Sequence, residues 1–184
     1  FAGAIGYRKG IHLIIQAFGN VIKVIPEARL IIAGSGEYEA EIDRLAKEYK
    51  LENYIIRMSW VGHDDLAKIL SASDVFLYPS LSYGGWEEQF GYSMAEASLM
   101  ELPVISTTSG SIEDVVINNK TGILVRPDDS EELFRAMILL AKDANLRTAM
   151  GQAGRRYIVE NFSNKIIAEK FYEFFKKINL HSQS

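Results

Sequence analysis

The sequence predicts an α/β fold, in which a doubly wound parallel sheet of about six strands carries helices on both faces. Three observations support this prediction. Short β-branched runs alternate with longer segments of helical period, several of the runs are apolar on both faces, and a crossover separates each run from the next. Strands that are joined by such crossovers lie parallel in one sheet.

Each expected element has its own local signal. The expected strands are short and apolar, and they cover residues 1–5, 29–33, 54–60, 74–78, 103–107 and 122–125. The expected helices cover residues 10–24, 38–49, 64–72, 91–100, 130–142, 144–160 and 164–178. In the first two of these helices, apolar residues recur at spacings of three and four. Asp128, Asp129 and Ser130 supply capping groups for the helix that begins at residue 130.

The composition is that of one ordinary globular domain. The 184 residues include 20 Lys and Arg against 24 Asp and Glu, which gives a net charge of −4, and 48% are hydrophobic. These values exclude disordered and collagen-like chains, and the mildly acidic balance argues against nucleic acid as a partner. No apolar run approaches the roughly 20 residues that span a bilayer. The chain has no cysteine, which suits a reducing compartment, so we expect a cytoplasmic protein.

Ligands of such a sheet gather at the carboxyl ends of its strands, which directs attention to the glycine-rich stretch 79–96. A helix start near Gly91 would offer free amide groups to an anion. Glu96 follows in an apolar part of this helix, so we expect it to be buried with hydrogen-bond donors around it. Either the hydroxyls of a ribose or a basic residue on a neighbouring helix could supply these donors. Glu87 and Glu88 are either site residues or surface partners of the helix dipole.

Residues 88–96, EQFGYSMAE, match the E-x7-E motif, in its E-x-F-G form, of retaining GT-B glycosyltransferases. This large family includes sucrose synthases and phosphatidylinositol mannosyltransferases. The segments SASDVFLYPS and ASLMELPVISTTSGSIEDVVINNKTGILVRPDD also resemble family stretches on either side of the motif. Essentially the whole chain resembles the C-terminal, nucleotide-sugar-binding half of a glycosyltransferase of group 1, which is a Rossmann-like half of the GT-B fold. The sequence begins at Phe1 directly in an apolar stretch, so we expect residues 1–180 to be a donor-binding domain whose N-terminal acceptor domain lies outside this chain.

The resemblance implies a role for each matching residue. Lys9 and Glu88 would be catalytic, with Lys9 neutralising the pyrophosphate and Glu88 contacting the donor sugar. The remaining donor-binding residues would lie in the motif and in the loop near the nucleobase: Gln89, Phe90, Gly91, Tyr92, Glu96, Gly62 and His63. Phe90, Gly91 and Tyr92 would present backbone amides to the diphosphate, and Glu96 would hold the ribose. The expected partner is a nucleotide-sugar donor, and no metal or other cofactor is expected.

The chain departs from the family pattern at Ala4, which stands where an arginine is usual. Arg8 either replaces this cation at the phosphate or is a solvated loop charge. The expected reaction is glycosyl transfer with retention. The resemblance leaves open whether the full-length enzyme associates peripherally with the inner face of a membrane.

Other readings of the sequence have weaker support. The chain could instead be a non-catalytic sugar-nucleotide-binding or epimerase-like domain on the same plan. A dinucleotide fingerprint fails because Glu39 stands where the third glycine of the Gly34 and Gly36 pattern is needed. His63, Asp64 and Asp65 could suggest a metal cluster, but Asp64 as a helix N-cap explains them more simply.

Overall fold

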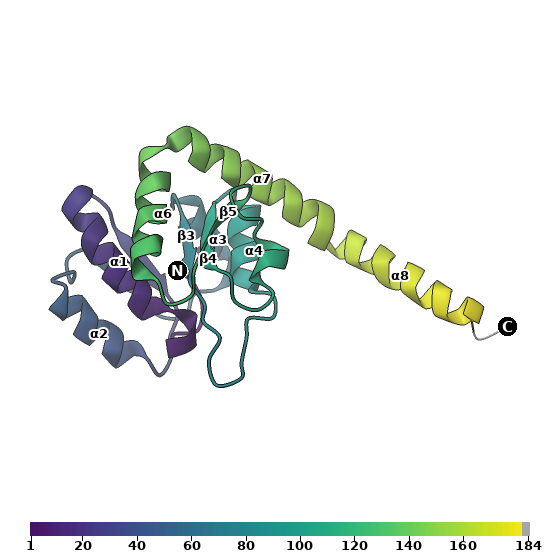
Figure 1. The fold of residues 1–184 in the computed structure, drawn as a ribbon, viewed down its shortest axis with the longest axis horizontal. Coiled ribbons are helices and arrows are strands. Elements are labelled where there is room, and N and C mark those ends of the chain that lie inside the picture. Colours follow the sequence, from purple (N-terminus) through teal and green to yellow (C-terminus); the bar gives the residue numbers. More distant parts are fainter. Residues whose placement is uncertain (182–184) are drawn as a thin grey trace.

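The computed structural model describes residues 1–181, and its strands are all parallel (Figure 1). They are β1 (Leu30–Ala33), β2 (Ile55–Met58), β3 (Phe76–Tyr78), β4 (Val104–Thr107) and β5 (Gly122–Val125). β1 pairs with β2, with Leu30 opposite Ile55. The other three strands form a second sheet in the order β3-β4-β5, in which Val104 lies opposite Phe76 and Gly122. The parallel α/β class is confirmed, with five regular strands in place of about six.

The missing strand is the one expected at residues 1–5. This segment runs beside β1, where the Gly3 amide donates to the Ala33 carbonyl (3.0 Å), but only Ala2 forms a β-bridge, with Ala33. Gly3 has a φ of +149°, which leaves the β region and interrupts regular pairing. The Phe1 ring stacks on Tyr78 of β3 at 5.9 Å, so the segment lies between the two sheets.

Helices follow the strands in the expected order. They are a 3₁₀ helix η1 (Tyr7–Lys9), α1 (Ile11–Val24), α2 (Glu39–Glu48), α3 (His63–Ser71), α4 (Tyr92–Leu99), α5 (Ile112–Val115), α6 (Ser130–Lys142), α7 (Ala144–Phe162) and α8 (Asn164–His181). The short helices η1 and α5 were not expected from the sequence. Asp129 caps α6 as predicted and accepts a hydrogen bond from the Glu132 amide. The prediction for Asp64 is wrong, because Gly62 is the N-cap of α3 and Asp64 lies in its first turn.

The helices pack in two groups on opposite sides of the second sheet (Figure 1). α1 packs against α2 and α6, and α4 packs against α7. The core between them is apolar, with fully buried side chains such as Ile14, Ile32, Ile105 and Leu133. α8 extends away from this body (Figure 1) and exposes the aromatic residues Phe171, Tyr172, Phe174 and Phe175. Within the described residues, no helix combines the length and apolarity that a membrane crossing needs.

Candidate functional site

A cavity of about 420 Å³ lies at the carboxyl end of β3, where α4 begins. Seven of its nine lining residues belong to the sequence motif, and the other two are Lys9 and Tyr78. The sequence did not point to Tyr78 or Ser93 as site residues. The lining consists of Lys9, Tyr78, Glu88, Gln89, Phe90, Gly91, Tyr92, Ser93 and Glu96. The structure therefore brings seven of the ten predicted site residues together around one opening.

The amino end of α4 opens into this cavity. Gly91 is the N-cap, in the left-handed conformation (φ 72°), and no side chain caps the helix. Among residues 1–181, the amide groups of Gly91, Tyr92 and Ser93 donate to no other protein group, whereas the Met94 amide already bonds the Gly91 carbonyl. Unpaired amides at a helix start carry partial positive charge and bind anions. The start of α4 thus leaves these amide groups available at the cavity.

Lys9 reaches the cavity because the loop after the first segment is held against the end of β3. Gly10 has a φ of +67°, and a Cβ there would lie 2.0 Å from the Pro79 carbonyl oxygen. The Leu81 amide and the Ser80 hydroxyl both donate to the Arg8 carbonyl, at 2.7 and 3.1 Å. A glycine at position 10 therefore allows the close approach that places Lys9 beside the motif.

Lys9 and Glu88 form a mostly buried ion pair, with 2.5 Å between Nζ and Oε2. Lys9 also makes a short hydrogen bond to the Tyr78 hydroxyl, and its Nζ lies 4.7 Å from the centre of the Tyr78 ring. The Tyr78 hydroxyl donates to Glu88 Oε2 at 3.0 Å, and the Ser80 hydroxyl, which shares its single proton with the Arg8 carbonyl, lies 3.2 Å from the same oxygen. One carboxylate oxygen thus collects three donors, so its charge is compensated inside the protein.

Burial and charge shift the acid–base properties of this cluster. Burial lowers the pKa of Lys9, and Glu88 only partly opposes this effect. For Glu88, burial acts to raise the pKa, but the hydrogen bonds and charge of Lys9, with Tyr78 and Ser80, bring it below the usual range. Burial and the Glu88 charge raise the pKa of Tyr78, so its phenol stays protonated. Burial thus works against the charge of Lys9, the hydrogen-bond donors favour the charge of Glu88, and the phenol of Tyr78 stays neutral.

Glu96 does not match its predicted environment. Its side chain is 38% exposed, and not buried, because the face of α4 that carries it borders the open cavity. His63 Nδ1 lies 3.8 Å from Glu96 Oε1, so a residue at the start of α3 reaches the same carboxylate. The expectation of an interior glutamate was wrong, and its carboxylate is accessible to a ligand.

Three predicted residues lie outside the cavity lining. Gly62 and His63 belong to the start of α3, and His63 approaches the site through its contact with Glu96. Arg8 is partly buried in η1, and its charge lowers the pKa of the neighbouring Lys9. Arg8 therefore adds positive potential near the cavity without lining it.

The ring of Phe90 packs against a residue outside the motif. The Phe90 ring packs edge-on against Phe162, at the end of α7, with 5.1 Å between centroids, and against Tyr92 at 5.2 Å. Sequence reasoning gave Phe90 only a backbone role. Its ring anchors the loop before α4 to the last turn of α7.

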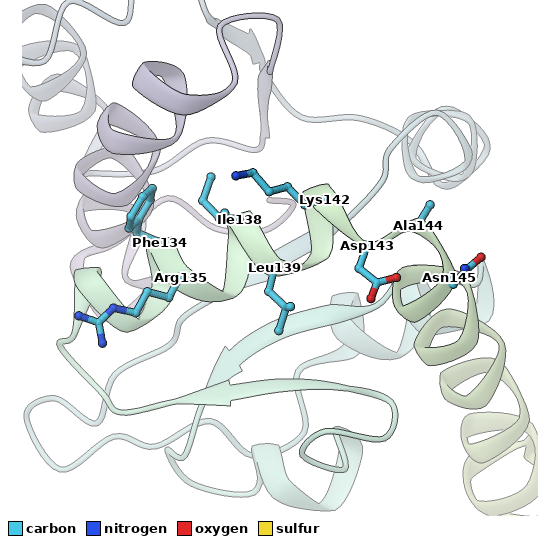
Figure 2. Close-up of a pocket in the computed structure, with 8 residues that line it drawn as sticks. All are labelled: Phe134, Arg135, Ile138, Leu139, Lys142, Asp143, Ala144 and Asn145. Atoms are coloured by element: carbon cyan, nitrogen blue, oxygen red, sulfur yellow. The ribbon is translucent and has the colours of Figure 1, made fainter.

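A larger hollow of about 720 Å³ lies at the corner of α6 and α7 and contains none of the predicted site residues. Figure 2 shows Arg135 and Lys142 pointing to different sides of α6. Two of its charged groups are already engaged, since Arg135 pairs with Glu131 at 3.1 Å and Asp143 accepts from the Leu146 amide at 2.9 Å. This hollow therefore does not compete with the motif cavity as a candidate site.

Comparisons with known proteins identify the family of this chain. Residues 1–157 match the family described as glycosyl transferases group 1. A GDP-mannose-dependent monoacylated alpha-(1-6)-phosphatidylinositol monomannoside mannosyltransferase of Corynebacterium glutamicum is 34% identical over 165 residues, which are 89% of this chain and 42% of the relative. The chain thus spans less than half the length of this relative.

Solved structures share the fold. The C-terminal domain of a glycosyl transferase group 1 family protein, LpcC from Francisella tularensis, superposes with a TM-score of 0.78 at 22% identity, covering 88% of this chain and 84% of that domain. Anabaena HepE in complex with UDP superposes with a TM-score of 0.86 at 20% identity, covering 96% of this chain and 47% of HepE. The fold of this chain is that of the C-terminal half of a GT-B glycosyltransferase, and the chain belongs to the glycosyl transferases group 1 family.

Proposed function

We propose that this chain supplies the nucleotide-sugar-binding site of a glycosyltransferase that transfers a sugar to an acceptor hydroxyl with retention at the anomeric carbon. The observation that carries the proposal is the meeting of unpaired amides at the start of α4 with the ammonium of Lys9 on one cavity. This pairing of a helix terminus and a cation suits a diphosphate. An acceptor domain outside this chain would complete the enzyme.

Each part of the donor has a matching group. The amides of Phe90, Gly91 and Tyr92 and the ammonium of Lys9 would hold the diphosphate, with Arg8 adding charge. Glu96, with an exposed carboxylate, would accept hydrogen bonds from the ribose hydroxyls. Gly62 and His63 would border the nucleobase, since His63 lies beside Glu96. Gln89 lines the cavity beside the sugar position.

Retention would follow from displacement on the front face of the sugar. The bond between the anomeric carbon and the diphosphate oxygen breaks, and the acceptor oxygen bonds the same carbon. The acceptor proton passes to the departing phosphate oxygen. Lys9 and the α4 terminus stabilise the charge that grows on that phosphate, in place of a metal ion.

Glu88 is better suited to positioning the sugar than to attacking it. Three donors already bond its Oε2 atom, which reduces its strength as a nucleophile. A sugar hydroxyl could still donate to Oε1. The pKa of Glu88 lies below its usual range, so the carboxylate would enter that contact ionised.

The test is calorimetric titration of the chain with UDP, GDP, UDP-glucose and GDP-mannose. We expect one nucleotide series to bind and a Glu96→Ala variant to lose about tenfold in affinity, the effect of one hydrogen bond to a charged group. Glu52→Ala, which removes an exposed carboxylate outside the cavity, should bind as the parent does. Equal affinities of the Glu96→Ala variant and the parent would refute the ribose assignment. Failure of all four nucleotides to bind would refute the proposal.

A further inference from the structure

The ammonium group of Lys9 is already occupied in this structure. Lys9 is 7% exposed, its Nζ atom lies 2.5 Å from Glu88 Oε2, and it donates to the Tyr78 hydroxyl. A diphosphate at the start of α4 would need this same positive charge. Two of the three N–H donors of Lys9 are engaged in this way, so a diphosphate would compete with the Glu88 carboxylate for the charge of Lys9.

Glu88 would not be left unpaired if Lys9 turned to the diphosphate. The hydroxyls of Tyr78 and Ser80 still donate to its Oε2 atom, at 3.0 and 3.2 Å. Both side chains are held by β3 and its end, and both residues are buried, at 4% and 0% exposure. The backbone of Tyr78 is tied in turn to β4, because the Ser106 hydroxyl donates to the Tyr78 carbonyl at 2.6 Å. The carboxylate thus has a fixed support that does not depend on Lys9.

We propose that the Lys9–Glu88 ion pair is a closed resting contact that a diphosphate opens, and that Tyr78 is the positioning residue that holds Glu88 while Lys9 turns to the phosphate. The inference rests on the proposed function of the cavity. The flexible four-carbon stem of lysine allows such a change of partner, whereas the strand holds Tyr78 in place. Diphosphate entry then frees Glu88 for a sugar hydroxyl, so that the two parts of the donor bind cooperatively.

The proposal predicts that removing a carboxylate from the site improves binding of the nucleotide alone. UDP and GDP, which carry no sugar, are titrated into the parent chain and into Glu88→Gln. Whichever of UDP and GDP the parent binds more tightly, Glu88→Gln should bind it at least about fivefold more tightly than the parent does, because Lys9 no longer has to leave an ion pair. A change of about fivefold is the lower end of typical coupling free energies between two sites. Unchanged or weaker binding by Glu88→Gln would overturn the proposal.

Glu87→Gln is the matched control, since it makes the same change of charge on the exposed neighbour of Glu88. Its affinity for UDP and GDP should equal that of the parent. An equal gain in both variants would point to general charge repulsion and would also overturn the proposal. Glu88→Asp provides a second variant if Glu88→Gln unfolds. It withdraws the carboxylate by one methylene and should give a smaller gain of the same sign.

Tyr78→Phe tests the positioning role, because it keeps the ring and removes the hydroxyl. We expect it to weaken UDP or GDP binding severalfold in the parent, where Glu88 needs support once Lys9 leaves. In the Glu88→Gln background the loss should be smaller, because only the contact of the hydroxyl with Lys9 is then removed. Equal losses in both backgrounds would mean that the hydroxyl acts only on the local structure, and the positioning role would be wrong.

Lys9→Gln separates this inference from the proposed function. If Lys9→Gln does not weaken UDP or GDP binding, the diphosphate lies elsewhere and the proposed site fails together with the inference. If Lys9→Gln weakens binding while Glu88→Gln fails to strengthen it, the site stands and the resting contact is wrong.

Discussion

The Ser111 amide donates a hydrogen bond of 2.8 Å to the carbonyl oxygen of Glu88. The loop after β4 thereby holds the segment that carries the carboxylate paired with Lys9. The residue before Ser111 makes this approach possible, because Gly110 has a φ of +60° and presents no side chain to the same backbone. The position of Glu88 is therefore set from two sides, by the β3 end and by this loop.

Replacing Gly110 by alanine should disturb this contact. A Cβ there would lie 2.4 Å from the Glu88 carbonyl oxygen and 2.8 Å from its amide nitrogen, and both atoms are backbone that cannot move aside cheaply. We expect Gly110→Ala to lower the free energy of unfolding by about 2 to 4 kcal/mol, the sum of a left-handed alanine and a steric overlap. Urea denaturation measures this loss.

Gly84 offers a matched control for that variant. It has the same φ of +60°, but a Cβ at this position would meet nothing within 4 Å. Gly84→Ala should therefore cost only the conformational strain, about 1 to 2 kcal/mol. Equal losses in the two variants would show that the contact with Glu88 is not tight.

Replacing Gly36 by alanine should separate the first segment from β1. A Cβ at Gly36 would lie 2.2 Å from the Ile5 carbonyl oxygen, and this contact is again with backbone. We expect Gly36→Ala to cost about 3 kcal/mol of unfolding free energy, at the upper end for an overpacked site. The exposed neighbour supplies the control, since Ser35→Ala should be neutral in the same thermal or urea melts. A stable Gly36→Ala would show that the loop yields easily.

The ion pair at the cavity should make the stability of the protein sensitive to acid. The pKa of Glu88 is lower in the folded chain than in the unfolded chain, so its contribution is complete above the unfolded value of about 4.3. That contribution is lost as the pH falls through the folded pKa. Urea unfolding of the parent should therefore show a loss as the pH falls below about 4.3, and this loss should be smaller in Glu88→Gln. The same loss in both proteins would mean that other carboxylates cause most of the loss of stability in acid.

The N-cap of α6 should be worth a measurable part of the stability. The Asp129 carboxylate accepts from the Glu132 amide at 2.8 Å and pairs with exposed Arg126 at 2.7 Å. Asp129→Ala should lower the free energy of unfolding by about 1 kcal/mol, mainly through the lost cap. Ser130→Ala should leave the stability unchanged, because its side chain makes no cap bond in the described structure. A neutral Asp129→Ala would show that water replaces the cap.

Much of the fold could be predicted because the apolar periodicity is local. The runs at β1, β3, β4 and β5 and the amphipathic pattern of α1 each lie within a short window. The irregular pairing of residues 1–5 could not be predicted, because the positive φ of Gly3 depends on its tertiary surroundings. Helix α5 could not be predicted, because a segment of four residues is too short to show a helical period.

The site was predictable as a motif but not as a cluster. The spacing of Glu88, Gly91 and Glu96 points to the start of one helix, and Lys9 follows from resemblance. The hydroxyl of Tyr78 reads in the sequence as part of a buried strand, and its contact with Lys9 spans 69 residues. The exposure of Glu96 depends on the cavity beside α4, which no local pattern reveals.

The ring contact between Phe90 and Phe162 has a practical consequence for anyone who wishes to shorten the protein. A fragment that ends before Phe162 would lose the ring that packs against Phe90 in the loop before α4. A fragment that ends at Ser163 would keep this ring contact and would lack the exposed aromatic residues of α8. The binding motif, located far earlier in the chain, thus decides where a crystallisation fragment can be cut.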